Sequence, residues 1–218
     1  MLRPNSAFAF LLLLYTAAAS AEVKQSAPES FFLSYSTPIS ASTAKAYTDV
    51  TQVQRWWSSE HTFSGKASNL SLKAEAGGCF CEKWSGGSVE HGRVIMALPG
   101  KLLRLDSALG PLQEFALKGI LSFWIKNEDG ATSLTVEYRV NGTAASGLDA
   151  LAPNVDEVLG AQVDRLKRYI GTGNPEAPVA EETKDASKAT DAAKPADSPK
   201  AKPGDPKKKS KPAVPVKP

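Results

Sequence analysis

Residues 77–94 read GGCFCEKWSGGSVEHGRV: a glycine pair, a strand rich in aromatic residues, a second glycine pair and a second strand. Apolar segments on both sides of a glycine pair are typical of two antiparallel strands joined by a tight turn. Upstream, Trp56 and Trp57 close a short helical pattern, where their large rings can hold a helix against a sheet. Together these features predict a curved sheet that packs against a helix around a cavity.

The segments on either side extend the same sheet, because apolar and polar residues alternate along them as they do in half-buried strands. Strands are predicted at residues 31–36, 70–75, 79–85, 89–98, 102–105, 115–126 and 134–140. A helix pair is expected between Ser40 and Trp57, with Ser40 or Ser42 as its N-cap. The sheet has one apolar face and therefore needs one cover.

The last apolar pattern is helical. Six residues fall on one stripe at helical spacing: Val155, Val158, Leu159, Val163, Leu166 and Ile170. Asp156 and Glu157 near the start and Lys167 and Arg168 near the end suit the helix dipole, and Gly171 ends the helix. The predicted fold class is therefore α+β, a curved antiparallel sheet wrapped around a long C-terminal helix.

The two ends of the chain differ from this folded part. Residues 1–21 have a positive start at Arg3, an apolar run and a small-x-small site ending at Ala21, which predicts a signal peptide cut after Ala21. An uncleaved anchor is the alternative, but the apolar run is short for a bilayer, so no membrane span is expected. Export to the periplasm or the medium follows. Residues 22–29 are assigned to a linker and 30–171 to one domain.

Residues 172–218 contain almost only Ala, Lys, Pro, Asp, Glu and Ser, a composition that predicts a disordered tail. The tip of the tail is cationic, with one aspartate against seven lysines: Lys200, Lys202, Lys207, Lys208, Lys209, Lys211 and Lys217. Such a tip can bind an anionic envelope polymer or lipid head groups, or can have no partner. Nucleic acid is not an expected partner, because the tail has no aromatic residue for base stacking.

Several motifs in this order resemble the helix-grip (START-like, SRPBCC) superfamily of lipid-transfer domains, birch-pollen allergens and polyketide cyclases. The likeness is greatest to bacterial domains named after the activator of Hsp90 ATPase. It lies in Arg55-Trp56-Trp57, Gly77-Gly78-Cys79-Phe80, Gly92-Arg93-Val94, Pro99-Gly100-Lys101-Leu102-Leu103 and the 159–169 helix face. It covers about residues 31–170 and implies a cavity between sheet and helix. It does not imply co-chaperone function, since fold does not determine activity.

The strand register follows if Gly86 and Gly87 form the turn: Glu82 then faces His91, and Lys83 faces Glu90. Continuing the phase of Leu70 and Leu72 turns six residues inward: Phe80, Glu82, Trp84, His91, Arg93 and Ile95. It leaves Val94, Met96 and Leu98 outward, a row that needs a loop or the partner of a homodimer to cover it. A bulge at Gly77 and Gly78 would instead turn Cys79 and Cys81 inward, together with that row. The first arrangement is favoured, because the family resemblance places an aromatic residue inward after the glycine pair.

In the favoured arrangement, polar groups converge on the wall of an apolar cavity, as in small-molecule pockets. The expected ligand-binding residues are Trp57, Phe80, Glu82, Trp84, His91, Arg93, Phe123 and Tyr138. Glu82 and His91 are also the candidate acid and base of a cofactor-independent cyclase or isomerase. A hydrogen-bonded pair that binds no ligand is the third alternative.

Cys79 and Cys81 are the only cysteines of the chain. On a regular strand their Cα atoms lie about 6.6 Å apart, at the outer edge of disulfide geometry. Free thiols are therefore expected first, a bridge second, and a metal site last, because no third or fourth ligand is apparent nearby. No metal and no cofactor is expected.

The chain is thus predicted to be an exported domain that binds a small apolar or amphipathic molecule. Two alternatives remain. One is the cyclase or isomerase that uses Glu82 and His91. The other is a module that docks on envelope partners through its cationic tail and the row of Val94, Met96 and Leu98.

Overall fold

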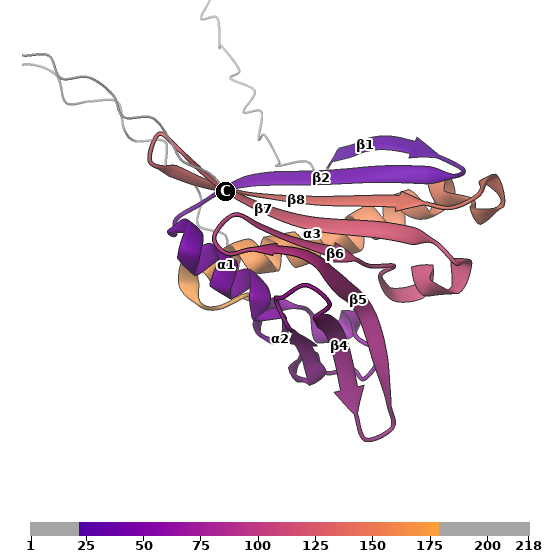
Figure 1. The fold of residues 1–218 in the computed structure, drawn as a ribbon, viewed down its shortest axis with the longest axis horizontal. Helices are drawn as coiled ribbons and strands as arrows, with labels where there is room; N and C mark the ends of the chain where they lie inside the picture. The colour runs from indigo at the N-terminus through magenta and orange to yellow at the C-terminus, as the bar shows by residue number, and fades with distance from the viewer. Residues whose placement is uncertain (1–21, 179–218) are drawn as a thin grey trace, which may run out of the picture. The chain divides into compact units, whose positions relative to one another are not determined.

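The computed structural model describes residues 22–178 (Figure 1). The expected signal peptide (1–21) and the tail from residue 179 lie outside the described residues. Eight antiparallel strands form one sheet in the order β1-β2-β8-β7-β6-β5-β4-β3. They are β1 Glu22–Ala27, β2 Ser30–Ile39, β3 Leu70–Leu72, β4 Cys79–Trp84, β5 Gly87–Leu98, β6 Leu102–Asp106, β7 Lys118–Glu128 and β8 Ala131–Asn141.

Three α-helices accompany the sheet: α1 Thr43–Thr51, α2 Val53–Trp56 and α3 Leu148–Thr172. Short 3₁₀ turns connect the other elements: η1 Ser59–His61, η2 Ala67–Asn69, η3 Gly110–Phe115 and η4 Ala144–Ser146. Figure 1 shows α3 running along one face of the sheet, behind β8 and β7. The predicted fold class, α+β with a curved antiparallel sheet and a long C-terminal helix, is confirmed.

The core lies between that face and α3. Alternate residues of β8 are buried, Leu134, Val136, Tyr138 and Val140 among them, as the period-two pattern predicts. From α3 the apolar stripe contributes Leu159, Val163, Leu166 and Ile170, also buried. Val158 on the same stripe is 36% exposed, because at that point the helix borders a pocket rather than the sheet.

The N-terminal boundary differs from the prediction. Residues assigned to a linker form β1, which pairs with β2 and makes the edge of the sheet. At the other end, α3 continues to Thr172, and Arg165 is ion-paired with Glu176, so the ordered fold extends past residue 171. Within the described part of the chain, no helix is both long and apolar enough to cross a membrane.

The β4–β5 hairpin has a different register from the predicted one. Trp84 pairs with Gly87, so the turn is Ser85-Gly86, and Glu82 pairs with Val89 rather than with His91. The Trp84 indole lies over the turn, since an added Cβ at Gly86 or Gly87 would come within 2.9 Å of it. Trp84 is therefore half-buried against its own hairpin, and the prediction that it points into the cavity is wrong.

Two bulges then change which side chains of β5 face inward. Phe80 pairs with Gly92 and Cys81 with Glu90, so His91 is the additional residue of the first bulge. His91 stays buried, but the residues between it and the second bulge change face: Arg93 points outward, and Val94 is buried. The predicted inward positions of Arg93 and Ile95 are wrong for this reason.

The second bulge lies at Ile95, between the pairs Val94–Leu105 and Met96–Arg104. It leaves three large apolar side chains of β5 exposed: Ile95 (48%), Met96 (39%) and Leu98 (47%). The outward row expected from the sequence therefore contains Ile95 in place of Val94.

Candidate functional site

A pocket of about 470 Å³ opens beside α3. Its walls come from four segments: the loop after α2, β5 through His91, the η3 segment and the first half of α3. The lining is mostly apolar and includes Trp57, Phe63, His91, Leu109, Pro111, Leu112, Phe115, Leu151, Val155, Val158 and Leu159. Glu60, His61, Thr62 and Asn154 supply polar groups to it. The volume lies within the range of small-molecule sites.

A buried carboxylate lies behind this wall. Glu82 is fully buried, and its Oε2 is 3.0 Å from Nε2 of His91. The backbone N–H of Phe63 donates to Oε2 (3.1 Å), and that of Ser64 donates to Oε1 (2.6 Å). Three donors thus converge on one carboxylate, an arrangement that stabilises the ionised form in a buried place.

Burial alone would raise the pKa of the Glu82 carboxyl, but the hydrogen bonds from Ser64, Phe63 and His91 outweigh it and hold the pKa below its usual value. Burial lowers the pKa of His91, and the nearby Glu82 offsets this only in part. At neutral pH the pair is therefore an ionised carboxylate beside a neutral imidazole. An ionised carboxylate only accepts, so the His91 proton is on Nε2, and Nδ1 is an acceptor.

The His91 ring is held between two aromatic rings, with centroids 5.9 Å from Phe63 and 5.0 Å from Phe80. His91 lines the pocket, whereas Glu82 does not. Within residues 22–178, no protein group hydrogen-bonds to Nδ1 of His91. The dyad thus leaves one hydrogen-bond acceptor, Nδ1, on a ring that lines a mostly apolar cavity.

The loop that carries Phe63 is anchored at three points. The Trp57 indole N–H donates to the carbonyl of His61 (2.9 Å), and the Ser58 N–H donates to Oε1 of Gln162 (2.8 Å). Gln162 is a buried residue of α3. Glu82 provides the third anchor through Phe63 and Ser64. Glu82 therefore has a structural task as well as orienting His91.

Five of the eight residues expected from the sequence lie at the pocket or behind it. Trp57 and His91 line the pocket, and Phe80 and Glu82 lie directly behind them, with the Phe80 ring 5.7 Å from that of Trp57. Phe123 lies deeper, against Trp56 (6.4 Å between centroids).

Trp84 and Arg93 do not take part in the pocket. Trp84 packs on the hairpin turn, and Arg93 is ion-paired with Glu90 and donates to the carbonyl of Gly77 (2.8 Å). The positions of both residues are set by the observed pairing of β4 with β5, which could not be predicted from the sequence.

Tyr138 affects the pocket indirectly, through hydrogen bonds to the backbone that leads into η3. Its hydroxyl donates to the carbonyl of Ser107 (3.0 Å) and accepts from the N–H of Leu109 (3.1 Å). Burial raises the pKa of Tyr138, so the hydroxyl remains a neutral donor and acceptor. It holds the start of the η3 wall in place rather than contacting the cavity.

Sequence reasoning missed most of the lining. Phe63 lies in a polar loop without periodicity, and Phe115 was assigned to the start of a strand. In the structure Phe115 ends η3, Ala116 is left-handed (φ 52°), and the strand begins at Lys118. The one feature of the sequence that could have indicated this wall is the group of apolar residues within 109–115, a segment without helix or strand periodicity.

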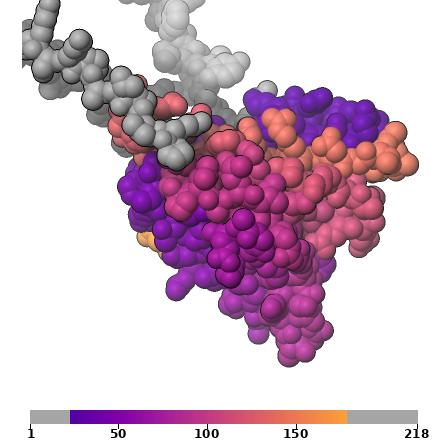
Figure 2. Space-filling model, viewed as in Figure 1, coloured from indigo at the N-terminus to yellow at the C-terminus, as the bar shows by residue number. Residues whose placement is uncertain are grey.

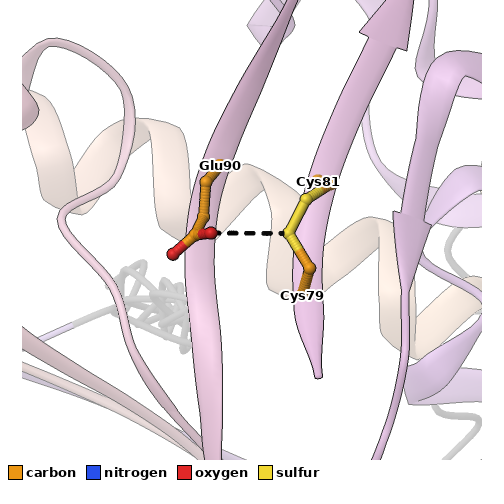
Figure 3. A group of neighbouring side chains, drawn as sticks. All are labelled: Cys79, Cys81 and Glu90. Carbon is orange, nitrogen blue, oxygen red and sulfur yellow. Dashed lines mark hydrogen bonds between the residues drawn. A yellow bond between two sulfur atoms is a disulfide. The ribbon is translucent and has the colours of Figure 1, made fainter. Parts of the chain in front are cut away.

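Cys79 and Cys81 form a disulfide, so the expectation of free thiols is wrong. Their Cα atoms are 5.4 Å apart, closer than on a regular strand. The bridge closes a ring of only three residues, for which the chain-entropy relation gives about 1.6 kcal/mol of stabilisation, against about 3 kcal/mol for a 15-residue loop. The bridge lies on the face opposite the dyad, beside Glu90 (Figure 3).

No protein-family model and no curated protein matches the sequence. Solved structures of similar fold include a conserved protein of unknown function from Enterococcus faecalis (14% identity, 69% of this chain and 75% of the other, TM-score 0.49). Others are the Aha1 dimer from Colwellia psychrerythraea (18%, 65% and 97%, 0.47) and CalU16 from Micromonospora echinospora (16%, 67% and 76%, 0.43). These likenesses concern the fold alone, and no family membership follows from them.

Proposed function

We propose that this protein binds a small apolar or amphipathic molecule in the pocket beside α3. The observation that carries the proposal is a mostly apolar cavity of about 470 Å³ with the imidazole of His91, bonded to Glu82 through Nε2, on its wall. Pockets of this kind bind the body of a ligand through apolar contact and orient it through a few polar groups. The preferred ligand has an apolar, ring-sized body and a hydroxyl or amide N–H that donates to Nδ1.

The preference for a donor follows from the protonation state of the dyad. With the proton of the neutral imidazole on Nε2, Nδ1 cannot donate, so a ligand carboxylate or ketone at this point would leave two acceptors facing each other. A ligand lacking any donor would leave Nδ1 unpaired once water is displaced, which costs affinity. Selectivity for a donor is therefore part of the proposal.

Export is a second part of the proposal and rests on the sequence of residues 1–21. In the periplasm or outside the cell, the lysines of residues 200–217 would meet anionic envelope polymers or lipid head groups. The tail would then keep a ligand carrier near the envelope.

Native mass spectrometry of the protein purified from its own envelope tests binding, with identification of any compound released on denaturation. A stoichiometric apolar or amphipathic compound is expected. The matched variants are Val158→Trp, which fills the pocket, and Met96→Trp, which changes a residue of similar exposure outside it (36% and 39%). The first should lose the compound and the second should keep it. Equal retention in both would remove the pocket from the proposal.

The same spectrum reports the intact mass and the oligomeric state. Loss of residues 1–21 would support export. A dimer is expected if a second copy covers Ile95, Met96 and Leu98, and those side chains then become protected from surface labelling.

A cofactor-independent cyclase or isomerase is the second candidate, favoured by the carboxylate-oriented neutral imidazole at the pocket wall. Glu82→Gln is a poor test, because it also removes acceptors from Phe63 and Ser64. His91→Gln is better, since its amide can still donate to Glu82 while Nδ1 is lost. If the protein transforms the compound it releases, this variant should lower kcat by about 10²–10⁴-fold with binding retained. An unaltered compound after prolonged incubation argues for carriage.

A further inference from the structure

We infer that Cys79, Cys81 and Glu90 form a second site which, once the disulfide is reduced, binds a thiophilic divalent cation such as Zn²⁺ or Cd²⁺. The site lies on the outward face of the β4–β5 hairpin, separate from the pocket. The space-filling view shows this hairpin projecting from the body of the molecule, where solutes can reach it (Figure 2). The inference does not depend on the proposed function.

The register of the hairpin assembles the three ligands. Cys81 pairs directly with Glu90, whereas the register expected from the sequence paired Glu90 with Lys83. The two sulfur atoms and a carboxylate oxygen of Glu90 all lie within 4.8 Å of one another, and Sγ of Cys79 is 3.9 Å from Oε2 of Glu90 (Figure 3). Zinc holds sulfur at about 2.3 Å and carboxylate oxygen at about 2.0–2.2 Å, so side-chain rotations that separate the two sulfur atoms bring three ligands to the cation, and a water completes the usual four.

Opening the bridge does not require unfolding. The disulfide joins residues two apart in one strand, so its loss removes little constraint from the chain. The backbone bonds around it do not involve sulfur: β4 remains paired with β3 and β5, and the Lys73 N–H remains bonded to the carbonyl of Cys79. Both cysteines are half-buried and Glu90 is exposed, so a reductant and a cation can both approach.

The chemistry balances with a dithiol as the reductant. One of its thiolates attacks a cysteine sulfur, the bond between Sγ of Cys79 and Sγ of Cys81 breaks, and a mixed disulfide forms. The second thiol of the reductant resolves the mixed disulfide and leaves as a cyclic disulfide. The protein gains two electrons and two protons. Cation binding then displaces the two thiol protons, because the thiolate is the form that binds metal.

The charges of the neighbourhood suit this cation. Two thiolates and one carboxylate carry three negative charges against two on the metal. The guanidinium of Arg93 contacts Glu90 and offsets the excess. Thiolate ligands select Zn²⁺ and Cd²⁺ over Mg²⁺ and Ca²⁺, which prefer oxygen. In the bridged form neither sulfur is a thiolate, so the redox state decides whether the site exists.

The test uses Cd²⁺ as the probe on the purified protein. One sample is reduced with a phosphine, freed of reductant without air, and titrated by calorimetry and by the thiolate-to-cadmium charge-transfer absorption. The other stays oxidised. The reduced protein should bind one Cd²⁺ per chain with the absorption band, and the oxidised protein should show no band. This comparison needs no variant, and intact mass verifies the gain of two hydrogens in protein that remains folded.

Two variants identify the ligands. Cys79→Ser with Cys81→Ser should abolish the band. Glu90→Gln should weaken binding by at least about tenfold, the smallest effect commonly seen even for residues behind a metal ligand. Glu128→Gln, an exposed carboxylate on β7, is the matched control and should bind as the unaltered chain does.

Three results would overturn the inference. One is a bridge that the phosphine cannot open in the folded protein. Another is a reduced protein that binds Cd²⁺ no better than the double serine variant. The third is a Glu90→Gln variant with unchanged affinity, which would leave two thiols without the third ligand.

Discussion

His91 and Glu82 are in hydrogen-bond contact, 3.0 Å between Nε2 and Oε2, although they are not opposite each other in the strand pairing. Glu82 pairs with Val89, and the bulge at His91 turns the imidazole inward beside the carboxylate. The bulge is held by the Ser107 hydroxyl, which donates to the carbonyl of His91 (2.6 Å). The contact between His91 and Glu82 thus depends on Ser107, which follows β6, as well as on the β4–β5 hairpin.

Glu82→Gln should destabilise the protein, because the N–H groups of Phe63 and Ser64 donate to different oxygens of Glu82 and the amide keeps only one of them. A buried donor left without a partner costs about 1–3 kcal/mol. We expect a loss of that size in the free energy of unfolding, measured in urea at neutral pH. The exposed control Glu128→Gln should change it by less than about 0.5 kcal/mol. A Glu82→Gln variant as stable as the control would show that the loop does not depend on the carboxylate.

The protein should lose stability as the pH falls, from both members of the dyad. The folded pKa of His91 is lowered from 6.5, so its contribution is complete above pH 6.5 and is lost as the pH falls through the folded value. The folded pKa of Glu82 is lowered from 4.5, so its contribution is complete above 4.5 and is lost at more acid pH.

Urea midpoints measured from about pH 8 to about pH 3 check this dependence. His91→Phe removes the histidine contribution, so the stability of that variant should be flatter in the upper window and should still fall in the lower one. If the unaltered protein and the His91→Phe variant lose stability equally as the pH falls below 6.5, the loss in that range belongs to another titrating group.

Gly92→Ala should be destabilising through the bulge. A Cβ at this position would lie 2.7 Å from Cβ of Ser107 and 2.9 Å from the carbonyl oxygen of Asp106. Forced overpacking of this kind costs about 1–3 kcal/mol, and the displaced bulge should also weaken ligand retention in native mass spectra.

Gly171→Ala is the control, and it should change the free energy of unfolding in the opposite direction. Nothing lies within 4 Å of its added Cβ, and the position is helical. We expect a gain of about 0.4–1 kcal/mol there, with ligand retention unchanged. Similar effects at Gly92 and Gly171 would contradict the close approach of Gly92 to Ser107.

Reduction of the Cys79–Cys81 bridge should leave the fold intact and lower the free energy of unfolding by no more than about 2 kcal/mol, because the ring is short. Urea unfolding with and without a phosphine, followed by circular dichroism, measures this. A loss well above that limit would mean that the bridge holds β4 in the sheet, and the cation site would then require a partly unfolded hairpin.

Much of the fold could be predicted from the sequence. Alternation along residues 134–140 predicted β8, and the stripe from Val155 to Ile170 predicted most of α3. These patterns are local: each depends on the period of one element and on which of its faces is buried. The inward positions of Phe80, Glu82 and His91 were also predicted correctly, because they precede or include the bulged residue.

The predictions failed where position depends on contacts distant in sequence. Arg93 and Ile95 were placed inward because nothing in the letters marks His91 as the additional residue of a bulge. Glu90 was paired with Lys83 because two glycines look like a turn, whereas the packing of Trp84 over Gly86 and Gly87 moves the turn back to Ser85 and Gly86. Phe63 gave no periodic signal, and it reaches the pocket because Trp57, Glu82 and Gln162 hold its loop.

By itself, then, the sequence determined the class of fold and the kind and order of the elements from β2 to α3, since these follow from interactions between near neighbours. Tertiary structure decided the register of β4 against β5, and with it the partners of His91 and Glu90. The physical reason is that a shift of one residue costs the strand pairing little by itself but moves every following side chain to the other face. The packing of Trp84 over the turn, the close approach of Gly92 to Ser107 and the burial of the Glu82 carboxylate among its three donors select one register.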